Sequence, residues 1–245
     1  MQVNLLQIHV EESPEANIEK VINLTKEVKG RIFILPELFT TGFNYDHVKR
    51  HVKSQPELLK KLPDSNTYIG SIARQADNNI YNSFFVKKGD KLDFIYDKIH
   101  LFPLMDEHIH FKSGNNTKIF ELDNFKCGCA ICFDLRFPEL FRQYFLNNVE
   151  VVFIPMQWPH SRVGQMIPLA TARAIENQCY VVICNAVGTI WGSYFGGNSM
   201  VISPTGELLV SAKENIDKVY SATLKKDVIN DFRKSMPIAN CLKLL

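Results

Sequence analysis

The sequence predicts a single α/β domain with mixed sheets that spans residues 1–245. Apolar runs of strand length alternate with segments whose apolar residues recur at helical spacing. Tight hairpin turns interrupt this alternation, so antiparallel as well as parallel pairs are expected. No segment has the composition of a linker, a repeat or a low-complexity tract, and 46% hydrophobic residues are enough for one sizeable core.

The first three elements form a strand–helix–strand unit. Residues 3–10 (VNLLQIHV) are apolar and β-favouring, which is typical of a buried strand. Ser13 and Pro14 provide a helix N-cap and a first-turn proline, and Gly30 is expected to end the helix. A second apolar strand follows at 31–35, and its continuous apolar run predicts a sheet covered by helices. The helix between them has apolar or small side chains at helical spacing: Ile18, Val21, Ile22, Thr25 and Val28.

The rest of the chain continues this mixture of strands and helices. Turns are expected in KKGDK at 87–91, at Asp123-Asn124 and in PTGE at 204–207. The other expected elements, from their periodicity, are a helix at 55–62, strands at 68–74, 80–86, 92–99, 118–122 and 125–131, a helix at 138–147, a strand at 151–155, a helix at 164–178, strands at 180–187, 198–203, 208–212 and 218–224, and a helix at 226–235.

Charge and cysteine content indicate which partners and which compartment to expect. A net charge of +2 and a pI near 8.1 predict neither nucleic acid nor an anionic membrane as a partner. The N-terminus lacks the features of a secretory signal, and no segment approaches the roughly 20 apolar residues of a membrane span. Six cysteines in a chain of this kind indicate reduced thiols, so we expect a cytoplasmic protein.

Three polar residues stand where apolar strands end. Glu37 follows RIFILP, Lys98 follows LDFIYD and Cys132 follows CGCAI. Strand ends in α/β sheets border the crevice in which ligands bind. Each residue alone also has a structural interpretation, because glutamate and lysine at strand ends are usually solvated and cysteine in an apolar run is usually a small core residue.

Together the three residues can perform nucleophilic catalysis. A thiol with an ordinary pKa of about 8.5 needs a base or a cation beside it. Glu37 can take the thiol proton, and Lys98 can stabilise the charge that develops on a carbonyl oxygen, together with a backbone N–H after Cys132. A Cys–His pair is the weaker interpretation, because no motif joins a thiol to any of His9, His47, His51, His100, His108, His110 and His160.

A zinc site is the other interpretation of the cluster Cys127, Cys129 and Cys132. The spacing lacks the usual two-residue gap on its first side. Alternation along a strand gives Cys127 and Cys129 one face and directs position 132 to the other, so three thiolates do not converge. We therefore expect Cys127 and Cys129 to be core residues, and we expect no metal or other cofactor.

These segments resemble a known family. ILPELFTTGF, YDKIHLF and GCAICFDLRFPEL resemble, in the same order, the three signature segments of the nitrilase superfamily of carbon–nitrogen hydrolases. The resemblance continues through ARAIENQCYVVICNAVG and GNSMVISPTGE to FRKS, which is almost the whole chain. LPELFTTGF and QWPHSR resemble most the bacterial omega-amidase branch, whose members hydrolyse 2-oxoglutaramate and similar 2-oxo acid ω-amides.

The resemblance implies a four-layer α-β-β-α sandwich that pairs into an eight-layer homodimer. It implies a catalytic triad at Glu37, Lys98 and Cys132, an assisting glutamate at Glu107, and an oxyanion-binding backbone N–H at Phe133. The sequence departs from the family pattern at three positions: Asp106 replaces a common Gly before Glu107, Phe133 replaces a common Tyr, and Pro168 lies where a helix former is more usual.

The expected substrate is a small 2-oxo acid ω-amide, whose far carboxylate needs a cation. Arg162 could bind that carboxylate, with Trp158 and Phe43 as apolar walls and His160 nearby. A surface ion pair is the structural alternative for Arg162. Arg136 and Arg173 are expected instead to stabilise the fold through carboxylates such as Glu139 and Glu176.

Two other functions remain open at this point. The same residues could act on an N-carbamoyl amino acid or a deaminated-glutathione-type amide. A protein of this fold could also bind ligands without turnover, although a scaffold has no reason to keep charges beside a thiol.

Overall fold

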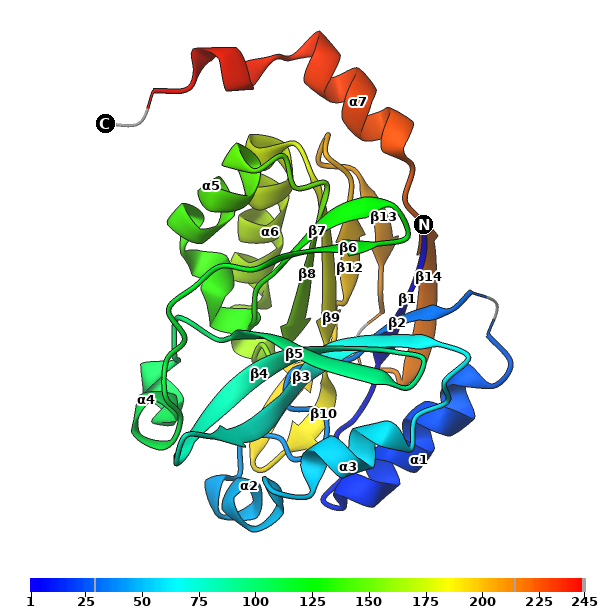
Figure 1. The fold of residues 1–245 in the computed structure, drawn as a ribbon, viewed down its shortest axis with the longest axis vertical. Helices are drawn as coiled ribbons and strands as arrows, with labels where there is room; N and C mark the ends of the chain where they lie inside the picture. The colour runs from blue at the N-terminus through cyan, green and yellow to red at the C-terminus, as the bar shows by residue number, and fades with distance from the viewer. Residues whose placement is uncertain (29, 214, 244–245) are drawn as a thin grey trace.

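The structure is a computed structural model that describes residues 1–28, 30–213 and 215–243. Two six-stranded sheets face each other in the middle of the molecule (Figure 1). Helices α5 (Pro138–Leu146) and α6 (Val163–Asn177) cover the outer face of one sheet, and α1 (Pro14–Thr25) and α3 (Gln55–Lys60) cover the other. The layers therefore follow the order α-β-β-α.

The first sheet has the strand order β14-β1-β2-β3-β4-β5. β1, β2 and β3 are parallel neighbours, because a helical crossover follows each of the first two strands, and hairpin connections make β4 and β5 antiparallel. The strands are β1 (Gln2–Gln7), β2 (Ile32–Ile34), β3 (Thr67–Ala76), β4 (Asn79–Lys88), β5 (Lys91–Asp97) and β14 (Lys218–Thr223).

The second sheet repeats this plan, in the order β13-β12-β9-β8-β7-β6. β7, β8 and β9 are parallel and are connected through α5 and α6, whereas the outer pairs are antiparallel. The strands are β6 (Ile119–Leu122), β7 (Phe125–Cys129), β8 (Val151–Met156), β9 (Tyr180–Asn185), β12 (Met200–Ile202) and β13 (Leu208–Ser211).

The remaining elements lie at the ends of the sandwich. α7 extends from the top of the body in Figure 1 toward the C-terminus. No helix of the described chain has the length and hydropathy of a membrane span. These elements are α2 (Tyr45–His51), α4 (Glu107–His110), α7 (Lys226–Ser235) and a two-stranded ribbon of β10 (Val187–Ile190) and β11 (Ser193–Gly196).

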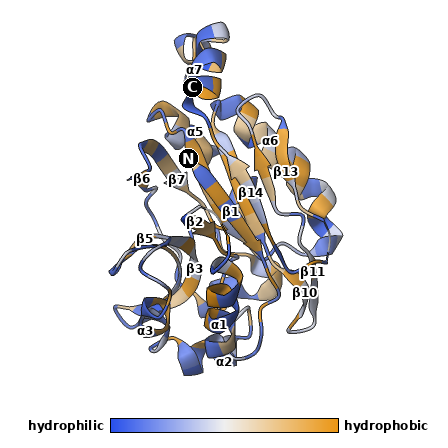
Figure 2. Ribbon diagram, turned by 90° about the vertical axis from the view of Figure 1, so that its right-hand side faces the viewer, coloured by the Kyte–Doolittle hydropathy of each residue, from blue (hydrophilic) through white to orange (hydrophobic). Residues whose placement is uncertain are grey.

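The main core lies between the sheets and beneath α5 and α6. Apolar side chains of both sheets meet there, such as Leu5 and Phe84 from the first and Val152 from the second, all fully buried. Cys127 and Cys129 belong to this core, as predicted. Figure 2 shows hydrophobic residues along central strands such as β1, whereas the peripheral helix α2 is mostly hydrophilic. Burial of each large apolar side chain contributes roughly 1.5–3 kcal/mol to stability.

The structure differs from the sequence prediction in several boundaries. α1 ends at Thr25, five residues before Gly30, and Thr25 bonds instead to the hydroxyl of Tyr68. Gly30 has φ +93° and turns the chain into β2. The predicted strand 180–187 is wrong at its end, because the side chain of Asn185 bonds to neighbouring backbone and the chain leaves the sheet for β10.

Two helical features also differ. Residues 45–51 form α2, which the sequence analysis did not predict, although Asn44 accepts the N-cap hydrogen bond from His47. Pro168 lies inside α6, which continues to Asn177.

Candidate active site

The ends of four strands meet at one place in the molecule. Glu37 follows β2, Lys98 follows β5, Cys132 follows β7 and Gln157 follows β8. Leu38, directly after Glu37, has φ +42°, and Cys132 has φ +44°. Left-handed conformations of this kind cost about 1–3 kcal/mol for non-glycine residues, so the turns that present these side chains are strained.

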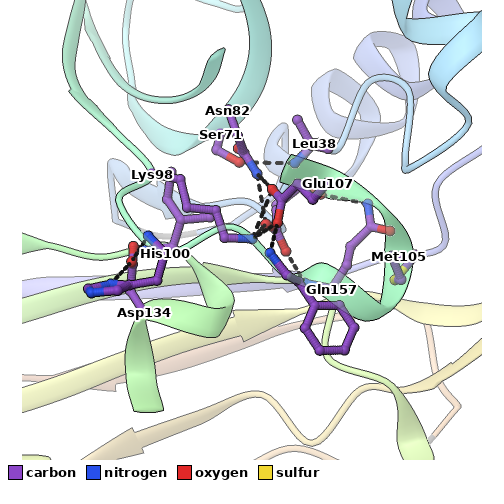
Figure 3. A network of polar contacts seen from close by, with 12 residues as sticks. Leu38, Ser71, Asn82, Lys98, His100, Met105, Glu107, Asp134 and Gln157 are labelled. Atoms are coloured by element: carbon purple, nitrogen blue, oxygen red, sulfur yellow. Dashed lines mark hydrogen bonds and ion pairs between the residues drawn. The ribbon is translucent and has the colours of Figure 1, made fainter. Parts of the chain in front are cut away.

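Lys98 joins the two glutamates. Its ammonium donates hydrogen bonds to Glu37 Oε1 at 2.8 Å and to both oxygens of Glu107, at 3.0 and 2.8 Å. All three side chains are fully buried. Figure 3 shows Lys98 reaching from the end of β5 toward Glu107, with Asn82 beside them. The structure thus brings together three residues that are 61 and 9 positions apart in the sequence.

Glu37 has further fixed partners. The backbone N–H of Gln157 donates to Glu37 Oε2 at 3.0 Å, and the Gln157 side chain donates to the Glu37 carbonyl at 2.7 Å. Asn82 donates to Glu37 Oε1 at 2.8 Å and to Glu107 Oε1 at 3.1 Å. The base candidate is therefore held by donors on both oxygens.

The position before Glu107 explains a departure from the family pattern. Asp106 has φ +53°, the left-handed region in which glycine is favoured and aspartate is tolerated. Asp106 therefore fills the place of the usual Gly without disrupting the turn. Glu107 also accepts a hydrogen bond from the backbone N–H of Phe102 at 2.7 Å, which fixes the segment at the mouth of the site.

Burial and charge shift the ionisation of these groups. Burial alone would lower the pKa of Lys98, but the carboxylates of Glu107 and Glu37 outweigh it and raise that pKa. Burial, followed by the charge of Glu37, raises the pKa of Glu107, although Lys98 opposes the shift. Burial and then the charge of Glu37 raise the pKa of the Cys132 thiol, which favours its protonated form.

Asp134 links the Cys132 turn to the segment that carries Lys98. Its carboxylate accepts from the Ile131 N–H at 2.9 Å and from the Tyr96 hydroxyl at 2.6 Å. It also accepts from His100, two residues after Lys98. Tyr96 and His100 therefore flank Lys98 in the sequence and bond to one carboxylate, which sets the position of Lys98 relative to Cys132.

Cys132 and Lys98 line the same cavity. Phe43, Trp158 and Arg162, the predicted substrate contacts, line the same cavity, together with Phe102, Phe133 and Arg136. His160 does not; it lies in an adjoining hollow beside Tyr194. The structure thus brings three of the four predicted substrate contacts to the thiol.

The two arginines of the cavity have no carboxylate partner in the described chain. Arg162 lies 5.6 Å from the ring centre of Phe102. Arg136 lies 4.9 Å from the ring of Trp158 and donates to Gln165. The expectation that Arg136 pairs with a carboxylate such as Glu139 is therefore wrong, because its guanidinium turns toward the cavity. Arg173 does pair with Glu176, at 2.8 Å, as expected.

The family follows from a comparison with known sequences. The carbon-nitrogen hydrolase family model matches residues 2–234. The chain belongs to this family. It is 34% identical to the 2-oxoglutaramate amidase of Bacillus subtilis over 91% of the chain and 93% of that protein. It is also 34% identical to omega-amidase YafV of Escherichia coli, over 91% of the chain and 88% of that protein. The predicted resemblance to the omega-amidase branch of the nitrilase superfamily is confirmed.

Solved structures of carbon–nitrogen hydrolases share the fold. The superfamily protein XC1258 of Xanthomonas campestris superposes with a TM-score of 0.93 at 23% identity, over 100% of this chain and 98% of that one. Nit3 of Saccharomyces cerevisiae, a member of the nitrilase superfamily, superposes with a TM-score of 0.86 at 22% identity, over 97% and 94%. The predicted α-β-β-α sandwich is confirmed.

Two polar contacts of the site, Gln157 and Asn82, were not predicted from the sequence of this carbon–nitrogen hydrolase. Gln157 stands directly after the apolar strand β8, so the strand-end criterion that selected Glu37 would also have selected it. Asn82 lies inside β4. The next residue, Ser83, is also polar and buried, so residue type alone did not single out Asn82.

Proposed function

We propose that this protein hydrolyses the terminal amide of small 2-oxo acid ω-amides, such as 2-oxoglutaramate, to the acid and ammonia. The observation that carries the proposal is one cavity that combines the Cys132 thiol, the Lys98 ammonium and two arginines without carboxylate partners. The names of the B. subtilis and E. coli relatives support the same substrate class.

The proposed first half-reaction is acylation of Cys132. The sulfur attacks the amide carbon while Glu37 takes the thiol proton. Because burial raises the pKa of the Cys132 thiol, a preformed thiolate is disfavoured, and proton removal during attack is required. Glu37 then gives the proton to the leaving nitrogen, the C–N bond breaks, and ammonia leaves a thioester on Cys132.

Lys98 and the Phe133 N–H are proposed to stabilise the oxyanion. The raised pKa of Lys98 keeps it an ammonium, so it acts as a donor and not as the base. Phe133 is the second residue of the 3₁₀ segment Cys132–Arg136, so its backbone N–H precedes the first hydrogen bond of that turn. Glu107 accepts two hydrogen bonds from the Lys98 ammonium, at 3.0 and 2.8 Å, and so holds it in position.

The second half-reaction releases the acid. Glu37 activates a water molecule that attacks the thioester carbon, and the C–S bond breaks as the proton returns to the sulfur. One base therefore serves both half-reactions.

Substrate choice is proposed to depend on the arginines. Arg162 and Arg136 offer planar N–H donors to a carboxylate and a neighbouring 2-oxo group. The carboxylates of the site, Glu37 and Glu107, are both engaged by Lys98, so neither is free to receive an α-ammonium group. A 2-oxo acid amide is therefore favoured over glutamine.

An N-carbamoyl amino acid or a deaminated-glutathione-type amide is the second candidate, because each also carries a carboxylate that the two arginines could bind. Release of carbon dioxide together with ammonia would distinguish a carbamoyl substrate. A scaffold without turnover is disfavoured, since burying two glutamates and a lysine beside a thiol is costly without a catalytic use.

The proposal includes a homodimer in the cytoplasm. Leu146 on α5 and Ile167 and Ile175 on α6 are exposed on the helix layer that would meet its counterpart in an eight-layer assembly. All six cysteines are free, which supports a reducing compartment. Light scattering of the wild type and of an Ile167→Glu, Ile175→Glu double variant tests the interface.

Ammonia release from a panel of amides tests the reaction. The panel contains 2-oxoglutaramate, glutamine, an N-carbamoyl amino acid and a neutral short amide. We expect turnover of 2-oxoglutaramate, no turnover by Cys132→Ala, and normal turnover by Cys241→Ser, which removes an exposed thiol far from this chemistry. A wild type that does not hydrolyse 2-oxo acid amides but hydrolyses carbamoyl compounds would contradict the proposed substrate class.

A further inference from the structure

Asn82 lies in the interior of β4, and its side chain is fully buried. A buried amide costs free energy unless its polar atoms are bonded, so its burial requires hydrogen-bond partners. Its backbone carbonyl accepts from the Lys98 N–H at 2.9 Å, which joins β4 to the end of β5.

The side chain completes a closed ring of hydrogen bonds. Glu37 Oε1 accepts from Asn82 Nδ2 and from Lys98 Nζ, each at 2.8 Å. Glu107 Oε1 accepts from the same two nitrogens, at 3.1 and 3.0 Å. Two donors and two acceptors therefore alternate around the ring, and Asn82 contacts Glu37, Glu107 and the backbone of Lys98.

The orientation of the amide is determined by this ring. With Nδ2 toward the carboxylates, the other end of the amide, Oδ1, is buried without a partner in the described chain. A flipped amide would direct its oxygen at two carboxylate oxygens, which repel it. The chain therefore leaves one acceptor unsatisfied to direct both N–H bonds of one amide at Glu37 and Glu107.

We propose that Asn82 is a positioning residue that keeps Glu37 and Glu107 ionised together around the single ammonium of Lys98. The inference rests on the proposed role of Glu37 as the base, but it does not depend on the identity of the substrate. The reason is charge balance: among the described residues, the ammonium of Lys98 is the only cation in ion-pair contact with the two carboxylates, so one negative charge has no counter-ion of its own.

Two neighbouring carboxylates without enough donors share a proton, as like charges disfavour joint ionisation. Burial and the charge of Glu37 already raise the pKa of Glu107. Hydrogen bonds from a neutral amide favour the ionised forms without adding charge. A proton taken up by this pair would occupy the base that must accept the Cys132 proton. Loss of the amide would therefore prevent activation of the thiol at the acidic end of the pH range.

The test compares Asn82→Ala, Asn82→Asp and the wild type in a Cys241→Ser background, which removes the exposed thiol. The readout is the rate at which iodoacetamide alkylates Cys132 as a function of pH, followed by mass spectrometry of its peptide. This rate reports activation of the thiol without any substrate. Asn17→Ala is the matched control, because Asn17 is also a fully buried amide with backbone partners but lies on α1.

In Asn82→Ala we expect the acidic limb of the alkylation profile to move to higher pH by about one to two units. A hydrogen bond to a charged group changes the equilibrium constant of its ionisation by roughly ten- to a hundred-fold. Asn82→Asp keeps the shape but adds a third carboxylate, so the limb should move further. Asn17→Ala should lower the melting temperature and leave the limb in place.

An acidic limb at the wild-type position in either folded Asn82 variant overturns the inference. Asn82→Asp covers the case in which Asn82→Ala fails to fold. A moved alkylation limb in a protein that releases no ammonia from 2-oxo acid amides would support the role of Asn82 and contradict only the proposed substrate.

Discussion

The carboxylate of Asp134 accepts two hydrogen bonds from His100, one from the backbone N–H at 3.0 Å and one from Nδ1 at 2.7 Å. Each residue lies two positions after a proposed catalytic residue, His100 after Lys98 and Asp134 after Cys132. The pair is visible at the left of Figure 3. The distance between the ammonium and the sulfur thus depends on a contact outside the cavity.

Loss of the His100 side-chain bond should lower kcat and leave KM unchanged. His100→Phe keeps the stacking of the ring on Phe137, whose centre lies 3.6 Å away, but removes the Nδ1 donor. We expect kcat to fall roughly 10-fold, the lower range for a hydrogen bond to a charged group. His100→Asn, which keeps a side-chain N–H near the same place, should recover much of the loss. Steady-state kinetics in which both variants fall equally, or in which only KM changes, would contradict this role of Asp134.

Loss of the cavity arginines should change substrate choice. Arg162→Met and Arg136→Met remove charge-assisted bonds to a substrate carboxylate but keep much of the side-chain volume. We expect kcat/KM for 2-oxoglutaramate to fall roughly 10- to 100-fold for the arginine that binds the carboxylate. Turnover of a neutral short amide should stay within about two-fold, since it makes no such bond. Equal losses of kcat/KM on both substrates would indicate that the arginines stabilise the fold and do not bind the substrate carboxylate.

Gln165→Ala serves as the control for Arg136. It removes the uncharged partner that fixes the Arg136 guanidinium and leaves the charge in place. A smaller loss than that of Arg136→Met is expected.

The buried thiols should make the fold sensitive to alkali. Burial raises the pKa of Cys179 from 9.0 to about 12. Between these two values the folded state keeps a proton that the unfolded chain has lost, so this contribution to stability is complete below about pH 9 and is lost as the pH rises. Cys179→Ala should therefore flatten the fall of the unfolding free energy by about 1.4 kcal/mol per pH unit in this window.

Urea unfolding between about pH 8 and pH 10.5 measures this slope. The lost packing of the sulfur lowers stability at every pH, so only the slope is diagnostic. Cys241→Ala, at an exposed position, should keep the wild-type slope. An unchanged slope in Cys179→Ala would contradict the assigned shift.

The pattern of strands and helices predicted a mixed α/β fold and the convergence of distant residues, whereas the four layers were predicted only from the resemblance to the family. Glu37, Lys98 and Cys132 are polar residues at the ends of apolar strands, and such strand ends border the crevice in which ligands bind. Here the strand ends come from both sheets, β2 and β5 from the first and β7 from the second. Asp106 replaces a common Gly, but this difference does not move Glu107 out of the site. The backbone at position 106 is left-handed, and aspartate tolerates that conformation.

Other features depended on tertiary contacts that local patterns do not encode. Whether Arg136 faces Glu139 or the cavity depends on two contacts. One is the ring of Trp158, in the loop after β8, and the other is Gln165 of α6. The end of β9 depends on bonds from Asn185 to residues of other segments. The role of Asn82 depends on the fold, because its amide donates to two glutamates from distant parts of the chain.

Everything proposed for catalysis requires an acyl group to pass through one sulfur. Rapid acid quenching during turnover of 2-oxoglutaramate, followed by mass spectrometry of the Cys132 peptide, measures that step directly. We expect a thioester on Cys132, formed together with a first equivalent of ammonia, and we expect Glu37→Gln to slow its formation by roughly 100-fold or more. Continued ammonia release with Cys132 unmodified, or persisting in Cys132→Ala, would contradict this mechanism.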